Sequence, residues 1–418
     1  MDERAAGAAA SVEAMFREER GRLLAALVRR FGDLDLAEEV ASEAMEAALV
    51  RWPVDGVPPK PGAWLMTTAR RRAVDRLRRD RVYAARLAVL QVEADRAGPA
   101  APADADGDLP DERLQLFFTC AHPALPDEDR AALTLRCLAG LATPEVARAF
   151  LVPPATMAKR IVRAKNKIRE ARIPFRVPGA DELPGRLPGV LQVLYSIFTE
   201  GYAASAGPDL QRPDLAEEAI RLVRILRRLL PAEREVAGLL ALMLLTYARR
   251  AARTGPDGEV VLLDDQDRRR WDRPMIEEGR ELAVVALTGG PPGLYGVQAA
   301  IAALHDEAPG VAGTDWPQVV ALYDVLLAIA PSPVVAMNRA VAVAMRDGLE
   351  AGLALLDGLA GDPRLRGHHP YQAARADLLC RLGRFAEAAA AYREALRLAG
   401  TEPDRAHLRR RLREAEGS

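Results

Sequence analysis

Cysteine is scarce in this chain of 418 residues, which contains only Cys120, Cys137 and Cys380. An odd and dispersed set gives no disulfide framework and is typical of a reducing compartment. Cys120 and His122 form one candidate metal pair, but zinc usually takes four ligands in paired spacings, and no second pair lies nearby. We therefore expect no metal site and a cytoplasmic protein.

Signatures of catalysis are also missing. The sequence has no GxSxG, HExxH, Walker A or dinucleotide-binding glycine motif. Without these motifs, nothing indicates a serine hydrolase, a zinc protease or a nucleotide-dependent enzyme. We expect a protein that is not an enzyme and that uses no cofactor.

Long apolar runs and a secretion signal are absent as well. The N-terminus, MDERAAGAAAS, has no basic segment followed by an apolar one. The longest apolar run, AGLLALMLLTYA at 237–248, is shorter than the about 20 residues that cross a bilayer. We expect neither export nor association with a membrane.

Aromatic residues make up 5% of the chain, β-branched alternation is nearly absent, and Ala, Leu, Arg and Glu dominate. This composition favours helices throughout, so the sequence predicts an all-α protein. Proline and glycine clusters divide it into two small helical domains, a linker and a longer helical tail. The predicted segments are 10–92, 93–111, 112–175 and 176–418.

The net charge of −1 conceals a strong segregation of charge along the chain. Eight arginines fall between Trp64 and Arg86, against Asp75 and Asp80. Residues 93–112 carry seven acids against one arginine, and their alanine- and proline-rich composition predicts a flexible acidic linker. Residues 156–172 carry seven basic residues against one glutamate. Two basic segments joined by an acidic one indicate an anionic partner.

Residues 141–171 have the pattern of a helix-turn-helix. Thr143 is placed to cap a short helix that begins at Pro144, and Pro153 and Pro154 begin a second one. In this second helix we expect a buried apolar stripe on one side and a basic face on the other. A recognition helix that enters the major groove has this arrangement. The stripe is Met157, Ile161, Ala164 and Ile168, and the outer face is Thr156, Lys159, Arg160, Arg163 and Lys167. The alternative is a solvated basic helix of a bundle.

An acidic helix is predicted at 33–49, followed by a loop from Pro53 to Gly62 and then by the arginine-rich helix at about 63–81. Its apolar positions are expected inward, at Leu36, Val40, Ala44 and Ala47, and its glutamates outward, at Glu38, Glu39, Glu43 and Glu46. In the arginine-rich helix, Trp64, Leu65, Thr68 and either Val74 or Leu77 are expected to face a core. An acidic helix is poorly suited to wrapping DNA, so we expect it to dock on a protein.

This order of parts resembles the extracytoplasmic-function sigma factors of bacterial RNA polymerase. "PGAWLMTTARRRAVDRLRRDR" at 61–81 is similar to the helix that engages and melts the minus-ten promoter element, and 141–171 to the reader of the minus-thirty-five element. Arg71 stands where many members have Asn. "LYSIFTEGYAAS" and "LLDDQDRRRWD" resemble the subgroup with a long tetratricopeptide-like C-terminal extension.

The resemblance implies partners and roles for named residues. It implies core RNA polymerase, contacted at the β′ clamp helices and the β flap, promoter DNA, and an extension that regulates in cis by contact with the sigma domains. The implied docking residues are Asp35, Glu38, Glu39 and Glu43. The implied minus-ten residues are Trp64, Arg70, Arg71, Arg72, Arg76, Arg78 and Arg79. The implied minus-thirty-five residues are Thr156, Lys159, Arg160, Arg163 and Lys167.

The tail has an internal period, with Tyr323 and Tyr392 separated by about two tetratricopeptide repeats of 34 residues. In the last unit, the spacing of Gly383, Phe385, Ala388, Tyr392 and Ala395 fits the helix-turn-helix of such a repeat. Other readings stay open. One is a repressor or activator with a tetratricopeptide-like sensor that does not bind polymerase, and another is a scaffold whose basic helices are incidental.

Overall fold

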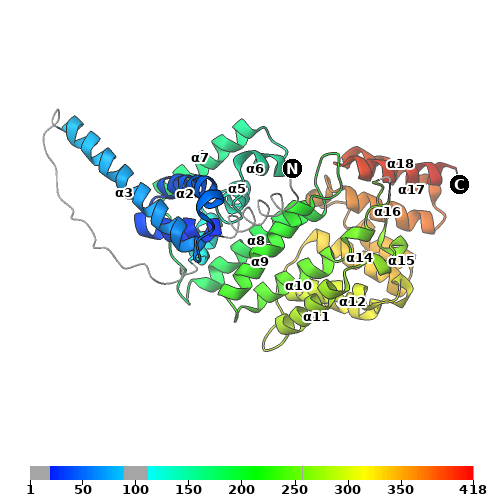
Figure 1. Ribbon diagram of the computed structural model, residues 1–418. Coiled ribbons are helices and arrows are strands. Elements are labelled where there is room, and N and C mark those ends of the chain that lie inside the picture. The colour runs from blue at the N-terminus through cyan, green and yellow to red at the C-terminus, as the bar shows by residue number, and fades with distance from the viewer. Residues whose placement is uncertain (1–18, 89–111, 257, 418) are drawn as a thin grey trace. The chain divides into compact units, whose positions relative to one another are not determined.

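The computed structural model describes residues 19–88, 112–256 and 258–417, without the side chains of 53, 54 and 80–88. The predicted linker 93–111, residues 10–18 of the first predicted domain, and the side chains of Arg81 and Arg86 lie outside this description. The chain divides into two compact units, residues 1–193 and 194–418. Helix α8, Leu183–Tyr202, runs across the boundary (Figure 1).

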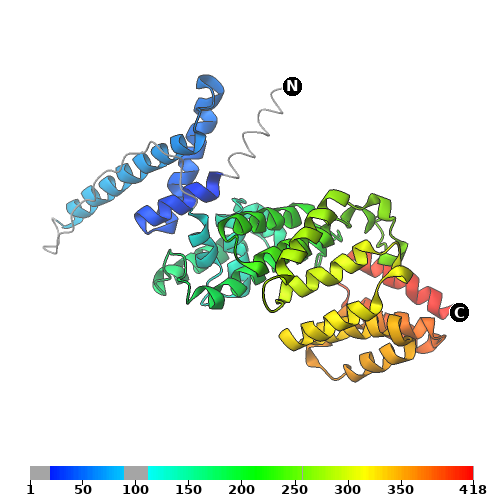
Figure 2. The same cartoon turned by 90° about the horizontal axis from the view of Figure 1, so that it is seen from below.

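In the described residues of the first unit, the regular elements are all helices. A helix over residues 19–31 comes first, and an Asp33 carboxylate that accepts the backbone N–H groups of Asp35 (2.8 Å) and Leu36 (3.1 Å) caps the next. The further helices are α2 Leu34–Asp55, α3 Pro61–Ala88, α4 Arg113–Cys120, α5 Asp127–Cys137, α6 Thr143–Ala149 and α7 Pro154–Glu170. Figure 2 shows α3 as one long helix whose C-terminal half extends beyond α2.

Helix α3 packs against α2 through small residues. Leu65, Ala69 and Ala73, four residues apart, have no exposed surface. Positions 69, 72, 73 and 76 share one face of α3, and Arg72 and Arg76 on that face pair with glutamates of α2. Ala69 therefore faces α2. The expectation that Val74 or Leu77 packs inward is wrong, because these side chains are 50% and 36% exposed and alanine lets the two helices approach closely.

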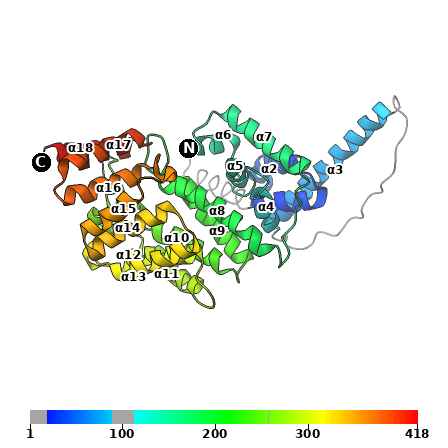
Figure 3. The ribbon, with the colours of Figure 1, turned by 180° about the vertical axis from the view of Figure 1, so that it is seen from behind.

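The second unit continues with helices that each pack against the next along the chain (Figure 3). Its further α-helices are α9 Pro213–Leu229, α10 Arg234–Tyr247, α11 Arg273–Leu287, α12 Leu294–Glu307, α13 Trp316–Ile329, α14 Pro333–Asp347, α15 Leu349–Gly358, α16 His369–Arg381, α17 Phe385–Leu398 and α18 Glu402–Glu416. The described part of the chain contains two isolated β-bridges but no strand. The all-α prediction is confirmed.

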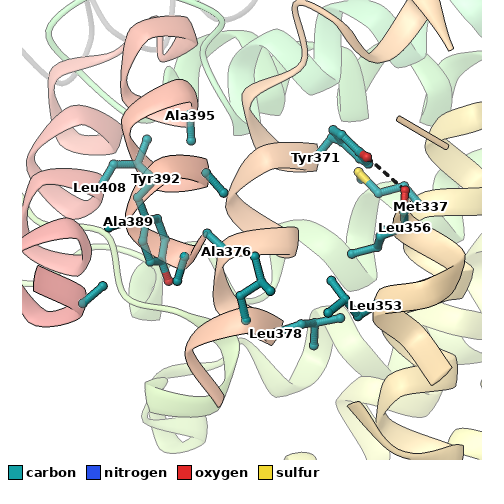
Figure 4. Close-up of a cluster of buried hydrophobic side chains, with 14 of the residues drawn as sticks. Met337, Leu353, Leu356, Tyr371, Ala376, Leu378, Ala389, Tyr392, Ala395 and Leu408 are labelled. Carbon is teal, nitrogen blue, oxygen red and sulfur yellow. Dashed lines mark hydrogen bonds between the residues drawn. The ribbon is translucent and has the colours of Figure 1, made fainter. Parts of the chain in front are cut away.

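Near the C-terminus, α16 and α17 form the predicted helix-turn-helix. Gly383 lies between them with φ +73°, a conformation that glycine adopts without strain. Ala388, Tyr392 and Ala395 of α17 are buried in a cluster that α14, α15 and α18 also line. Figure 4 shows Tyr371 of α16 donating its hydroxyl to the carbonyl of Leu356 on α15, at 2.9 Å. Helix pairs thus share a continuous core, as in repeat proteins.

A buried carboxylate lies in the middle of this unit. The Asp306 side chain, near the end of α12, has no exposed surface, and Arg249 Nε is 3.6 Å from its Oδ1. Within the described residues neither carboxylate oxygen accepts a hydrogen bond. Burial raises the pKa of Asp306 to about 7, although Arg249 and Arg268 act in the opposite direction.

The stability of this unit should therefore depend on pH through Asp306. Its folded-state pKa lies above the unfolded value of about 4, so its contribution to stability is full below pH 4 and is lost as pH rises toward 7. We expect the stability advantage of Asp306→Asn over wild type, measured as free energy of unfolding, to be about 2 kcal/mol larger at pH 8 than at pH 5. Thermal unfolding at both pH values measures this. Glu307→Gln, at an exposed neighbour, should show no such gain, and equal behaviour of the two variants would contradict the prediction.

Candidate nucleic-acid interface

The predicted helix-turn-helix is formed by α6 and α7. Leu151 in the turn has φ +50°, and the next residue, Val152, donates its N–H to the carbonyl of Ala147 at 3.0 Å. The expected cap at Thr143 is wrong, because α6 begins at that residue and Ala142 precedes it. The Glu145 carboxylate accepts the N–H of Ala142 at 2.6 Å, so a side chain within α6 caps its first turn.

Helix α7 has the two faces that its sequence predicts. The buried residues of this helix are Met157, Ile161, Ala164 and Ile168. Thr156, Lys159, Arg163 and Lys167 are exposed. Since residues three and four apart share a face, the exposed cationic side chains lie together on one side of α7.

Arg160 is the exception among the predicted contacts of α7. Its guanidinium lies 2.7 Å from the Glu128 carboxylate and 5.7 Å from the ring centre of Phe150, and its side chain is 16% exposed. Glu128 lies in the first turn of α5 and Phe150 directly follows α6, so Arg160 links the recognition helix to both neighbours. A DNA role for Arg160 requires it to leave these contacts.

The second basic surface lies on α3. Arg71, Arg78 and Arg79 are exposed, whereas Arg70 is partly buried. Arg72 lies 2.9 Å from Glu43, and Arg76 lies 2.5 Å from Glu39 and 3.6 Å from Glu43. The structure therefore brings two predicted DNA residues together with two predicted docking residues. Among the described side chains of α3, Arg71, Arg78 and Arg79 are open to an anion.

Trp64 lies at the start of α3 and packs edge-on against Trp52 of α2, with ring centres 5.5 Å apart. The loop between these helices is shorter than the sequence indicates. A loop from Pro53 to Gly62 is expected, but α2 continues to Asp55 and α3 begins at Pro61. Proline has no backbone N–H to donate, so residue 53 lacks one helical hydrogen bond. The backbone N–H of Gly56 still reaches the carbonyl of Trp52, at 3.0 Å.

The four predicted docking acids of α2 divide by partner. Glu39 and Glu43 contact α3, whereas Asp35 and Glu38 contact α5 and α7. The expectation that Glu38 faces outward is wrong, because it is 7% exposed. Its partners Arg20, Arg136 and Lys165 were not predicted as site residues. One signal was available, since Lys165 follows Ala164 at the edge of the buried stripe of α7.

Metal binding and membrane insertion find no support in the described ranges. His122 Nδ1 accepts the N–H of Ala124 at 3.2 Å, and Cys120 is buried. Within residues 19–88, 112–256 and 258–417 no group of three His, Cys, Asp or Glu side chains has the geometry to hold a metal. None of the described helices has the length and hydropathy needed to span a bilayer.

Three segments match known protein families. Residues 15–82 match Sigma-70 region 2, and residues 118–168 match Sigma-70, region 4. Residues 186–287 match a family of unknown function, DUF6596. The chain is also 44% identical to the uncharacterized protein R00370 of Rhizobium meliloti (strain 1021), over 94% of this chain and 93% of that one. The two basic surfaces, on α3 and on α7, fall within the two sigma-70 matches.

Proposed function

This chain belongs to the sigma-70 factors of transcription initiation, in the extracytoplasmic-function type with a C-terminal helical extension. We propose the following role for each of its segments. Residues 10–92 bind core RNA polymerase and act on the minus-ten element, and residues 112–175 read the minus-thirty-five element. Residues 93–111 link them, and residues 176–418 regulate both in cis.

The outer face of α7 is the observation that carries the minus-thirty-five assignment. Lys159, Arg163 and Lys167 are exposed opposite a fully buried stripe, at the second helix of a helix-turn-helix. A helix in this position inserts into the major groove, where Lys and Arg contact phosphates and guanine edges. Thr156 near the helix start is placed to reach the backbone, and Arg160 joins if its pair with Glu128 opens.

At the minus-ten element, α3 supplies cations for a separated strand. Melting exposes bases that must be held out of the stack, and a single strand binds where cations follow its backbone and aromatic rings stack on its bases. Arg71, Arg78 and Arg79 provide exposed charge, and Trp64 lies at the start of the same helix. Arg72 and Arg76 pair with glutamates of α2 and form one edge of this surface, and Arg70 is partly buried.

Docking on core polymerase is assigned to the acids of α2. Asp35, Glu38, Glu39 and Glu43 bind the β′ clamp helices, and the α4–α7 domain binds the β flap. Run-off transcription with purified core enzyme and the full chain tests the whole assignment. Promoter-specific transcripts are the expected result. Specific duplex binding without association with core enzyme would instead mark a repressor or activator.

Removing the partly exposed glutamates should weaken docking. We expect Glu39→Ala with Glu43→Ala to lower affinity for core enzyme about tenfold, because each carboxylate removed weakens attraction to a cationic partner by roughly 0.7 kcal/mol. Titration of labelled chain with core enzyme measures this. Glu46→Ala, at an exposed position of the same helix, is the matched control. If the double variant binds as Glu46→Ala does, these two residues do not dock.

The extension is proposed to regulate the sigma domains by intramolecular contact. Its last helices, α14 to α18, share one core, and repeat arrays of this kind present extended surfaces for docking of other segments. A chain that ends after residue 206 keeps all of α8 and removes α9 to α18. Run-off yield from this chain, compared with the full chain at equal occupancy of core enzyme, gives the sign of regulation. An unchanged yield would contradict regulation in cis.

A further inference from the structure

The extension contains a cluster of buried polar groups that lack hydrogen-bond partners. Its centre is Asp306 on α12, whose side chain has no exposed surface. Within the part of the chain that the structure describes, neither of its carboxylate oxygens accepts a hydrogen bond. Arg249 Nε, Arg268 Nη2 and Trp271 Nε1 are buried donors without an acceptor there. Most buried polar groups in proteins are hydrogen-bonded, so this concentration indicates a bound partner that supplies the missing bonds.

The cationic and anionic groups of this cluster lie close together. Arg249 Nε is 3.6 Å from Asp306 Oδ1, a distance too long for a hydrogen bond. The Arg268 guanidinium is held at the end of α12, because its Nη1 donates to the carbonyl oxygens of His305 and Ala308, both at 2.8 Å. One carboxylate and two guanidinium groups therefore share one site.

Aromatic side chains hold these polar groups in place. The Arg268 guanidinium lies 4.3 Å from the ring centre of Trp271, which is buried. The ring centres of His305 and Trp316 are 5.5 Å apart. Burial, together with the charges of Arg249 and Arg268, lowers the pKa of His305 to about 4, so this imidazole is neutral at physiological pH. The charges at the centre of the site are therefore one carboxylate and two guanidinium groups.

These charges decide which class of ligand satisfies the cluster. A simple cation would pair with Asp306 but would lie against Arg249 and Arg268. A simple anion would pair with the two guanidinium groups but would lie against the Asp306 carboxylate. A compound with both an ammonium group and a carboxylate supplies donors to the acid and acceptors to the arginines. Charge-assisted hydrogen bonds of this kind are about twice as strong as neutral ones.

The short distance within the cluster limits the spacing of those two groups in the ligand. Because Arg249 Nε and Asp306 Oδ1 are 3.6 Å apart, the groups that bind them must lie on neighbouring atoms. In an α-amino acid a single carbon separates the ammonium nitrogen from the carboxylate. We propose that the cluster binds a free α-amino acid, with its ammonium group on Asp306 and its carboxylate on Arg249 and Arg268.

The backbone around the cluster gives a ligand access. The described residues of 249–272 contain short 3-10 turns and no α-helix. Arg268 is only partly buried and Arg269 beside it is exposed, so one edge of the site borders solvent. Irregular segments carried by a rigid scaffold are where binding residues concentrate. This inference goes beyond the proposed function, because it concerns the extension alone and requires no polymerase.

Titration calorimetry of the full chain at pH 8 tests the site, with the common free L-amino acids as probes, one at a time. We expect at least one of them to bind with a dissociation constant of about 1 mM or tighter. The same compound without its ammonium group, and the same compound without its carboxylate, should each bind at least about tenfold more weakly. A ligand with one charge leaves part of the cluster unpaired.

Two variants separate the two halves of the site. Asp306→Asn keeps the shape of the side chain but removes the charge that binds the ammonium group, and Arg249→Gln weakens the contact to the carboxylate. Each should lower the affinity at least about tenfold. Glu307→Gln, at an exposed neighbour, should bind as wild type does. Thermal unfolding of each variant shows that it is folded.

Affinity should also rise with pH, because only the ionised form of Asp306 pairs with an ammonium group. Burial raises the pKa of this carboxyl to about 7. The charged groups that also act on it are Arg249, Arg268, Arg273 and Glu307. His305 beside it stays neutral above its own pKa of about 4. The ionised fraction rises from about a tenth at pH 6 to about nine tenths at pH 8, so affinity should rise roughly tenfold.

The outcomes decide between a ligand and ordered water. If no amino acid binds at about 10 mM, water fills the cluster and the proposal is wrong. It is also wrong if Asp306→Asn binds as Glu307→Gln does, or if a singly charged analogue binds as tightly as the amino acid. Binding that is lost in Asp306→Asn and in Arg249→Gln, and that strengthens with pH, supports it. None of these measurements involves polymerase, so their failure leaves the proposed function untouched.

Discussion

Replacing both Lys159 and Arg163 with alanine is expected to weaken binding to a minus-thirty-five duplex about a hundredfold at physiological salt. Both side chains are exposed on the outer face of α7, and each contact to phosphate or guanine contributes on the order of 1.4 kcal/mol. Because the double variant makes two fewer phosphate contacts, its binding also releases fewer counterions from the DNA. The slope of log affinity against log salt should therefore fall in magnitude by about 1.8.

Duplex titrations at several salt concentrations measure both quantities. Lys165→Ala removes the same charge from the same helix, but from the side that faces α2, so its affinity and slope should match wild type. If the double variant lost affinity while keeping its salt slope, the two cations would not contact phosphate. If it kept both, the bundle alternative for α7 would hold.

Ala69→Leu is expected to have the other large effect, on region 2. Ala69 has no exposed surface and lies on the face of α3 that meets α2. Three added carbons in a close helix contact cost about 3 kcal/mol in overpacking and force α3 away from α2. We expect promoter-directed run-off transcription to fall more than tenfold, while binding of duplex by α7 is retained.

Hydrogen exchange of the α2 and α3 amides should report this local loss of protection. Thr67→Leu places a similar side chain on an exposed position of the same helix and should leave both exchange and transcription near wild type. Equal exchange rates in Ala69→Leu and Thr67→Leu would show that the α2 and α3 contact has room that its burial does not indicate.

Periodicity predicts the faces of α7 well because one stripe of apolar residues alone decides which side is buried. Met157, Ile161, Ala164 and Ile168 meet a single core, and the basic side chains follow on the other side. The helix pair α16 and α17 is predictable for a similar reason, since Gly383 marks the turn and the buried alanines keep the repeat spacing.

Prediction fails where a residue meets a second partner. Glu38 looks like any outward acid of α2, and only the approach of α5 and α7, about 100 residues later in the chain, supplies the cations that allow its burial. In α3, Val74 and Leu77 are more hydrophobic than Ala69, yet Ala69 is the buried residue. Its small side chain allows α2 and α3 to approach closely. Which of these residues is buried depends on how closely the helices approach one another, and a single sequence does not give that distance.

The contact of Ala69 and Ala73 with α2 also has a bearing on how promoter preference can change among related chains. Neither side chain has exposed surface, so a larger residue at either position is expected to cost stability through overpacking. Arg71, Arg78 and Arg79 point into solvent, and exchanging them disturbs no packing. If α3 contacts the minus-ten element as proposed, promoter preference can diverge by replacement of these surface residues one at a time, while the packing of α2 on α3 stays the same.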